Sequence, residues 1–332
     1  MQVLPEAAQA ASAAYHQSDS NGGIQRMQSV RGKRSKVPAI VKYKNVYIIL
    51  LPVLLYYLIL AYGPMIGNVI AFQDYSITRG LFASKWVGLK HFRSFLTNYS
   101  CFRLIRNTLM INLYGLIFGF PAPIILALLL NEVRSSGFKR TVQTITYMPY
   151  FISTVVIAGM MLDFLNTRGL INAIIELFGG EKIQFLVRAE MFWGIYTVSE
   201  IWQGVGWGSI IYLSALSGVD MDLYEASAID GANRFHQLVH VTLPSILPTI
   251  MIMLILRLGQ MMSLGYEKIL LIYTPAIYET ADVISTYVYR KGLLEQSFSY
   301  STAVNLFNSV INFVLLVSAN RISRAATGSS LW

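Results

Sequence analysis

The sequence predicts an all-α integral membrane protein with six transmembrane helices, and three observations lead to this fold class. Hydrophobic residues make up 55% of the 332 residues and charged residues only 13%, whereas a soluble domain carries about 25% charged residues. The mean hydropathy is positive, at +0.51. Apolar runs approach the roughly 20 residues that span a bilayer at residues 46–72, 109–130, 145–164, 191–216, 241–262 and 303–319.

These runs are predicted to be helices because backbone groups in lipid must form hydrogen bonds within the segment. An outer-membrane barrel would instead show short strands of alternating polarity. Within span one, the pair Gly63–Pro64 predicts a kink near the outer end of the helix. Residues 73–106 are polar and aromatic, and we expect them to form a folded external cap. Residues 131–141 form a short turn that makes spans two and three antiparallel neighbours.

The distribution of positive charge predicts that both termini lie in the cytoplasm. Lysine and arginine accumulate on the cytoplasmic side of membrane proteins, and here they cluster at residues 26–44, at residues 134–140 and near the C-terminus, in Arg321 and Arg324. An even number of spans agrees with this assignment. The external loop at residues 74–106 opposes it, because that loop holds six basic residues and a single acidic one.

The distribution of charge also predicts the segments of the chain. It argues against nucleic acid as a partner. Residues 1–44 are predicted to form a mobile basic tail, residues 45–324 a transmembrane domain and residues 325–332 a short C-terminal tail. No apolar core precedes the basic cluster, so the tail is not a cleaved signal peptide. The formal net charge of +9 follows from the positive-inside distribution alone.

The cytoplasmic loop at residues 218–240, between spans four and five, carries the most specific pattern of the chain. Asp222 and Glu225 have the spacing of an acidic capping box, so a short helix is predicted to begin at Asp222. Gly231 permits a turn, and a second helical piece at residues 232–240 leads into span five, with a proline in the first turn of that span. Small residues let another backbone approach closely, which suits docking better than catalysis.

This loop resembles the EAA loop of binding-protein-dependent importers, whose pattern is Glu-Ala-Ala, three residues, Gly, nine residues, Ile, any residue, Leu-Pro. The spacing agrees throughout, and two positions depart conservatively, with Ser227 for the second Ala and Val241 for Ile. The resemblance extends from residue 40 onward and is greatest for permeases of oligosaccharides and polysaccharide fragments. The residues that it implies in coupling to an ATPase are Glu225, Ala226, Ser227, Asp230, Gly231, Ala232, Leu243 and Pro244.

What the resemblance implies is the permease fold of a type I importer, in the bacterial inner membrane. Two ATPase subunits, which bind ATP and Mg, would dock on the loops and switch the helices between inward-open and outward-open states. The resemblance further implies a second related permease in a heterodimer, a soluble or lipid-anchored solute-binding protein and an oligosaccharide substrate. This chain lacks the Gly-x-x-x-x-Gly-Lys-Ser/Thr pattern of a P-loop. We therefore expect it to be no enzyme and to hold no cofactor itself.

Polar residues inside the spans are candidates for the translocation path, because they are costly in lipid and tend to face a cavity or a partner. Span four places four such residues on one helix face, with Trp193 close to that face. Aromatic rings and hydrogen-bonding groups together suit sugar rings, although the aromatic residues could equally anchor the helix at the membrane interface. The predicted path consists of Trp193, Tyr196, Glu200, Gln203, Trp207, Arg257 and Gln260.

Arg257 has two interpretations: it meets an anionic substrate, or it pairs with a carboxylate such as Glu200 or Asp163. We favour the ion pair. Span six carries three asparagines on one face, and packing against another helix is their expected role. These are Asn305, Asn308 and Asn312. His236 and His240 have the spacing of a metal site, but no glutamate accompanies them as in zinc hydrolases, so neither a metal site nor a catalytic site is predicted.

The identity of the substrate and the class of transporter leave alternatives open. The basic external loop at residues 74–106 favours an acidic oligosaccharide such as alginate, or a negatively charged binding protein. Two other classes of function are a secondary transporter driven by an ion gradient and a membrane scaffold without cargo. A secondary transporter predicts an inverted repeat, which is not visible in this sequence. Co-purification with an ATPase would separate the importer from both.

Overall fold

The computed structural model describes residues 43–327 and divides the chain into two units, residues 1–65 and residues 66–332. Most of the predicted basic tail, residues 1–44, lies outside the described residues. The same holds for residues 328–332 of the predicted C-terminal tail. The predicted division into tail, membrane domain and tail therefore stays a prediction.

The first unit is helical throughout its described residues. It consists of α3 (Lys44–Tyr56), the π turn η1 (Tyr57–Tyr62) and α4 (Gly63–Met65). Regular α geometry is interrupted at the π turn η1, directly before Gly63 and Pro64, where the sequence predicts a kink. None of these residues is buried. Their apolar side chains are therefore available to lipid or to another polypeptide.

Five helical stretches are long and apolar enough to cross a membrane. They are Lys44–Phe72, Cys101–Glu132, Thr154–Leu177, Arg234–Leu258 and Phe298–Ala325. The predicted fourth span coincides with α12 (Phe192–Ser217), which is long enough at 26 residues but carries too many polar and glycine residues to join the five. The predicted all-α membrane fold is confirmed, and the count of six spans stays a prediction.

The predicted third span, residues 145–164, is not one helix. The chain there forms α9 (Ser136–Tyr147), the 3₁₀ turn η4 (Met148–Phe151) and α10 (Thr154–Leu165). Proline at position 149 lacks a backbone N–H and favours the break, and Ser153 then caps α10 by accepting a hydrogen bond from the Val156 N–H at 3.4 Å. The predicted turn at residues 131–141 shortens to residues 133–135, because Ser135 caps α9.

In the second unit, α12 is the central helix of the membrane domain. It packs along α8 (Pro121–Glu132), α9 and α15 (Leu243–Leu258), and α8 continues α7 (Cys101–Tyr114) through the π turn η3 (Gly115–Gly119). Glycine makes one of these contacts possible: a Cβ on Gly206 would lie 2.1 Å from the Thr146 carbonyl oxygen. The short helix α11 (Leu170–Leu177) follows α10, and the 3₁₀ turn η5 (Ala189–Met191) leads into α12.

The segment between the first two spans is folded, as predicted, although α7 begins at Cys101, earlier than the predicted start of span two. It contains η2 (Ile66–Phe72), β1 (Gln73–Asp74), α5 (Gly80–Ala83), β2 (Lys85–Trp86) and α6 (Lys90–Leu96). The two strands pair antiparallel, with Gln73 opposite Trp86. Lys90 Nζ lies 2.9 Å from Asp74 Oδ2, and this hydrogen bond lowers the pKa of the Asp74 carboxyl.

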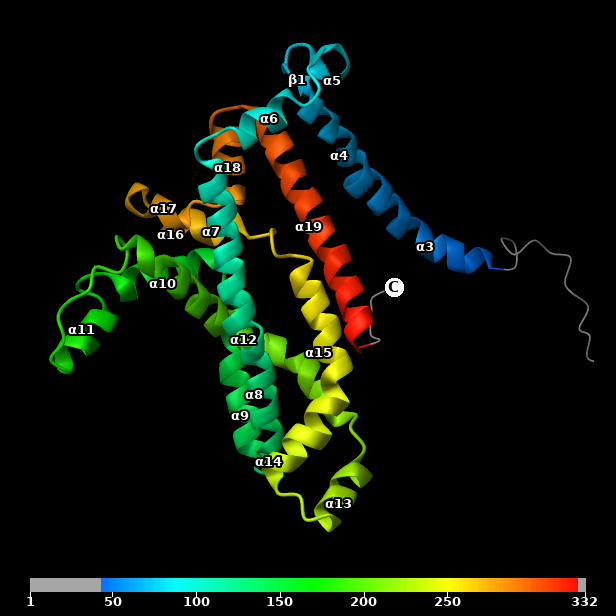
Figure 1. The fold of residues 1–332 in the computed structure, drawn as a ribbon, viewed down its shortest axis with the longest axis vertical. Helices are drawn as coiled ribbons and strands as arrows, with labels where there is room; N and C mark the ends of the chain where they lie inside the picture. Colours follow the sequence, from blue (N-terminus) through cyan, green and yellow to red (C-terminus); the bar gives the residue numbers. More distant parts are fainter. Residues whose placement is uncertain (1–42, 328–332) are drawn as a thin grey trace, which may run out of the picture. The chain divides into compact units, whose positions relative to one another are not determined.

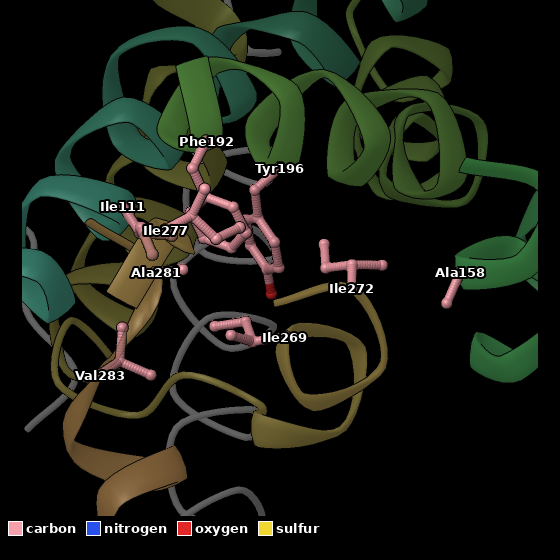
Figure 2. Close-up of a cluster of buried hydrophobic side chains, with 9 residues drawn as sticks. All are labelled: Ile111, Ala158, Phe192, Tyr196, Ile269, Ile272, Ile277, Ala281 and Val283. Carbon is pink, nitrogen blue, oxygen red and sulfur yellow. The ribbon is translucent and has the colours of Figure 1, made fainter. Parts of the chain in front are cut away.

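A second cap segment joins α15 to the last helix. It comprises α16 (Tyr266–Ile272), η7 (Pro275–Ile277), α17 (Tyr278–Ala281), α18 (Ile284–Tyr289) and η8 (Arg290–Leu294), and α19 (Phe298–Thr327) follows. Its apolar side chains pack against α7, α10 and α12 in the cluster that Figure 2 shows. The fully buried Asp282 carboxylate accepts a hydrogen bond from Arg290 at 2.8 Å and lies 3.5 Å from Arg103 of α7. This ion network anchors the cap segment to the membrane helices.

Two asparagines of α19 bind this helix to the turn that follows α15. Asn308 Nδ2 donates to the Met262 carbonyl at 2.9 Å, and Asn312 Oδ1 accepts from the Met262 N–H at 2.7 Å. Both side chains therefore satisfy the backbone groups of Met262, which lies in the turn after α15. The predicted packing role is confirmed for these two residues, whereas Asn305 is exposed.

Candidate functional site

The loop between α12 and α15 forms a helix–turn–helix elbow at the end of the second unit opposite α18 (Figure 1). Helix α13 (Met221–Ile229) begins after Asp220, whose Oδ1 accepts a hydrogen bond from the Asp222 N–H at 3.0 Å. The predicted start at Asp222 is thus one residue late, and the capping residue is Asp220. Asp220 is a stronger cap because its carboxylate reaches the free N–H groups of the first turn.

The turn of the elbow depends on Gly231, as predicted. Its φ of +81° lies in the left-handed region that favours glycine, and the Ala232 N–H donates to the Ser227 carbonyl at 2.9 Å. Asn233 then caps α14 (Arg234–Gln237) by accepting from the His236 N–H at 2.9 Å. The second helical piece therefore begins two residues later than predicted.

Ser227, which departs from the EAA pattern, braces the elbow. Its hydroxyl donates to the Tyr224 carbonyl at 2.8 Å and accepts from Gln237 Nε2 at 3.1 Å. The Tyr224 hydroxyl in turn lies 2.9 Å from Thr242 Oγ1. These bonds attach α13 to the helix that follows, so the two parts of the elbow are held in a fixed relation.

The outer surface of the elbow is open. Glu225, Ala226 and Asp230 are exposed, and so are two large apolar side chains, Ile229 at 87% and Phe235 at 69%. Exposed apolar side chains beside small residues and carboxylates are typical of a surface that another polypeptide covers.

One helix connects the elbow to the interior of the membrane domain. Arg234–Leu258 is a continuous stretch of 25 residues, made of α14, the π turn η6 (Leu238–Thr242) and α15. Such a helix is roughly 35 Å long. Pro244 lies in the first turn of α15, where the preceding π turn accommodates its missing N–H. The elbow and Arg257 therefore occupy opposite ends of one continuous helical stretch.

Two cavities in the membrane domain share a wall that contains Glu200 and Arg257. The first, of about 420 Å³, opens between α7, α12, the end of α15 and α16. The second, of about 430 Å³, lies between η3, α8, α12 and α15. Both cavities are lined by Gly115, Thr197, Glu200, Gly204 and Arg257. Together we call them the charged cavity.

Glu200 pairs with a residue that the sequence did not indicate. Lys268 of α16 donates to Glu200 Oε1, and also to Gln203 Oε1 at 2.7 Å. The predicted ion pair of Arg257 with Glu200 or Asp163 is therefore wrong. Within residues 43–327, no carboxylate pairs with the Arg257 guanidinium and nothing accepts a hydrogen bond from it. The sequence signal for this partner is a lysine directly before an apolar run, Lys268 in Tyr266–Ile272.

Residues 119–327 match the family described as binding-protein-dependent transport system inner membrane component. The chain belongs to this family. It is thus a multi-pass protein of the inner membrane, as the resemblance of its loop implied, and the elbow is the EAA loop of this permease.

Related proteins and structures extend the likeness over most of the permease. It is 45% identical to protein LplB of Bacillus subtilis (strain 168), over 87% of this chain and 92% of the relative. It is 44% identical to the polygalacturonan/rhamnogalacturonan transport system permease protein YteP of the same organism, over 86% and 89%. A crystal structure of a bacterial ABC transporter that imports the acidic polysaccharide alginate matches with a TM-score of 0.81, at 41% identity, over 87% of this chain and 98% of that chain.

Not every predicted path residue of the permease reaches the charged cavity. Tyr196, Glu200, Gln203 and Arg257 line the first part of it, and Gln260 lines the second part with Glu200 and Arg257. The two tryptophans line neither part. Trp193 Nε1 donates to the Thr280 carbonyl at 2.9 Å. Trp207 stacks on Tyr150, with ring centres 4.7 Å apart, and Tyr150 lines the cavity in its place.

The predicted pair His236 and His240 shows no sign of a metal site. The two rings stack with centres 5.8 Å apart, and no group of three histidine, cysteine or acidic residues suited to a metal occurs within residues 43–327. The ring of His236 contacts Asn233 Oδ1 at 3.0 Å. This pair belongs to the surface of the elbow.

Proposed function

We propose that this permease forms one half of the translocation path of an ATP-driven importer for acidic oligosaccharides. The observation that carries the proposal is the Arg257 guanidinium, which faces the charged cavity without a carboxylate partner in the described residues. A guanidinium binds a carboxylate through two parallel hydrogen bonds. A uronate offers that group on each ring.

Two further features support an acidic sugar as the substrate. Aromatic and hydrogen-bonding side chains, Tyr150, Tyr196 and Gln203, line the cavity beside Arg257, and sugars need both kinds of contact. The related proteins point to the same class, because YteP is named for polygalacturonan transport and the similar structures come from an alginate importer. One of those structures holds a periplasmic protein bound to an alginate pentasaccharide, and it matches with a TM-score of 0.82 at 40% identity.

The partners of this proposal follow from the elbow and from the family. Two ATPase subunits, which hold ATP and Mg, bind the exposed surface around Glu225, Ala226 and Asp230. A second, related permease completes the pore as a heterodimer, and a solute-binding protein delivers the oligosaccharide. Movement of the elbow reaches Arg257 through the helix Arg234–Leu258. An ion-driven secondary transporter or a scaffold would need neither an ATPase nor an EAA loop.

Transport by the complete complex tests this function. The permease, its second permease, the ATPase and the binding protein are reconstituted in proteoliposomes, and uptake of uronate and neutral oligosaccharides of equal length is compared. We expect ATP-dependent uptake of the uronate, reduced about tenfold by R257Q because one charge-assisted contact is lost. The matched control is R168Q, which removes an exposed arginine outside the cavity. Preferred uptake of the neutral sugar would contradict the proposal.

A further inference from the structure

Lys268 is a buried cation in the wall of the charged cavity. Its side chain is only 6% exposed, whereas the Glu200 side chain that it contacts is 49% exposed. Besides Glu200 and Gln203, the Lys268 ammonium lies 5.7 Å from the centre of the Tyr196 ring. The lysine is thus enclosed by its partners, and the carboxylate is open to the cavity.

This asymmetry decides which partner can be exchanged. A buried ammonium without a counter-charge costs several kcal/mol, so Lys268 requires a carboxylate at all times. Glu200 has no such requirement, because half of its side chain already faces the cavity, where water can hydrate the released carboxylate. A second carboxylate that enters the cavity can therefore take the place of Glu200, while Gln203 keeps its hydrogen bond to Lys268.

The remaining charges of the cavity wall agree with such an exchange. The first part of the cavity is lined by two acids, Glu200 and Glu267, and by two bases, Lys268 and Arg257. A neutral sugar has no group that can replace a carboxylate on a buried ammonium, so it leaves the pair intact.

We propose that Lys268 selects substrates by charge: Glu200 is its resident counter-ion in the empty cavity, and a carboxylate of the oligosaccharide displaces Glu200 from it. The inference rests on the proposed function, because it requires an acidic substrate. The permease then discriminates between acidic and neutral sugars by itself, independently of the binding protein.

Equilibrium binding to the complete transporter tests the exchange. The transporter is placed in nanodiscs without binding protein and titrated with trigalacturonate and trimannuronate, each beside its fully methyl-esterified, uncharged form. We expect E200Q to tighten binding of the acids about tenfold, because the competing carboxylate is gone and Lys268 has no counter-ion until an acid enters the cavity. The esters, which cannot replace a carboxylate, are expected to bind E200Q and the unchanged protein alike.

Two further variants separate exchange from a general effect of charge. E267Q removes an acid of the same cavity that does not contact Lys268, so we expect it to change acid binding less than about threefold. K268Q removes the selecting cation and is expected to weaken acid binding about tenfold. Should K268Q fail to assemble, the contrast between E200Q and E267Q decides alone, because both variants keep every cation.

The outcomes distinguish this inference from the function on which it rests. Equal binding of acids and esters by the unchanged protein would contradict the proposed function and the exchange together. A preference for acids that E200Q weakens or leaves unchanged would overturn only the exchange, since the Glu200–Lys268 pair would then be structural. Equal gains in acid affinity in E200Q and E267Q would also overturn the exchange, because they would show that the loss of any negative charge in the cavity strengthens acid binding.

Discussion

The EAA elbow and the charged cavity solve different physical problems within one permease. The elbow is exposed, and neutral hydrogen bonds around Ser227 together with the left-handed turn at Gly231 hold its shape. The cavity instead concentrates charge, with a buried Lys268, a half-exposed Glu200 and an Arg257 that pairs with no carboxylate among residues 43–327. We therefore expect function in the first region to depend on backbone shape, and function in the second to depend on which charges are paired.

The two regions are mechanically connected, which makes the comparison testable. Arg257 is next to the last residue of the continuous helix Arg234–Leu258, and the elbow contains the first residues of that helix. Changes of shape at the elbow should alter ATP-dependent movement for every substrate. Changes of charge in the cavity should alter affinity for acidic substrates only.

The largest effect is expected from Gly231→Val. A β-branched residue at a φ of +81° costs about 1–2 kcal/mol, and the elbow relieves this strain by opening its turn. We expect ATP hydrolysis stimulated by loaded binding protein to fall about tenfold, with acidic and neutral probes bound as before. The measurement is ATPase activity of the complex in proteoliposomes.

Gly137→Val is the matched control for that change. Gly137 lies inside α9, and a Cβ there meets nothing within 4 Å, so valine is tolerated without strain. Equal losses in both variants would show that the turn at Gly231 has no special role, and the contrast between shape and charge would then fail.

A smaller effect, confined to acidic substrates, is expected from Gly115→Ala. The new Cβ would lie 2.7 Å from Arg257 Nη2, and because that atom ends a flexible side chain, the guanidinium shifts while the helix stays folded. Uronate uptake should fall a few-fold, on the order of 0.5–1 kcal/mol, without a loss of thermal stability. Gly119→Ala is the control, since its Cβ would meet Ile201 at an ordinary 3.8 Å.

The elbow could be predicted well because its residues are close together in the chain. The turn at Gly231 and the helix on each side of it follow from local rules for glycine and for helix caps. The same rules placed the cap of α13 at Asp222 instead of Asp220, because two aspartates within three residues both satisfy a cap pattern. Hydropathy also missed the interruption of span three before α10, because the apolar run is continuous there. The local signal for this interruption is Pro149, which lacks the backbone N–H that an α-helix uses.

The cavity could be predicted only in part, because its wall comes from distant elements. Periodicity placed Tyr196, Glu200 and Gln203 on one face of α12, and that face does line the cavity. Which cation meets Glu200 depends on how α15 ends and how α16 packs against α10, and no local pattern reports this. The sequence therefore does not indicate Lys268, and the carboxylate partner that it predicts for Arg257 does not occur within residues 43–327.

The smallest effect is expected from Ser227→Ala, which restores the second alanine of the EAA pattern. The change removes the hydroxyl that accepts from Gln237 Nε2 at 3.1 Å. Gln237 still donates to the Tyr224 carbonyl at 3.3 Å, so the loss should not exceed about 1 kcal/mol. Substrate-stimulated ATP hydrolysis should fall less than about threefold, whereas Gln237→Leu, which removes both bonds, should lower it further. A Ser227→Ala loss as large as that of Gly231→Val would mean that polar bracing, rather than the turn, sets the shape of the elbow.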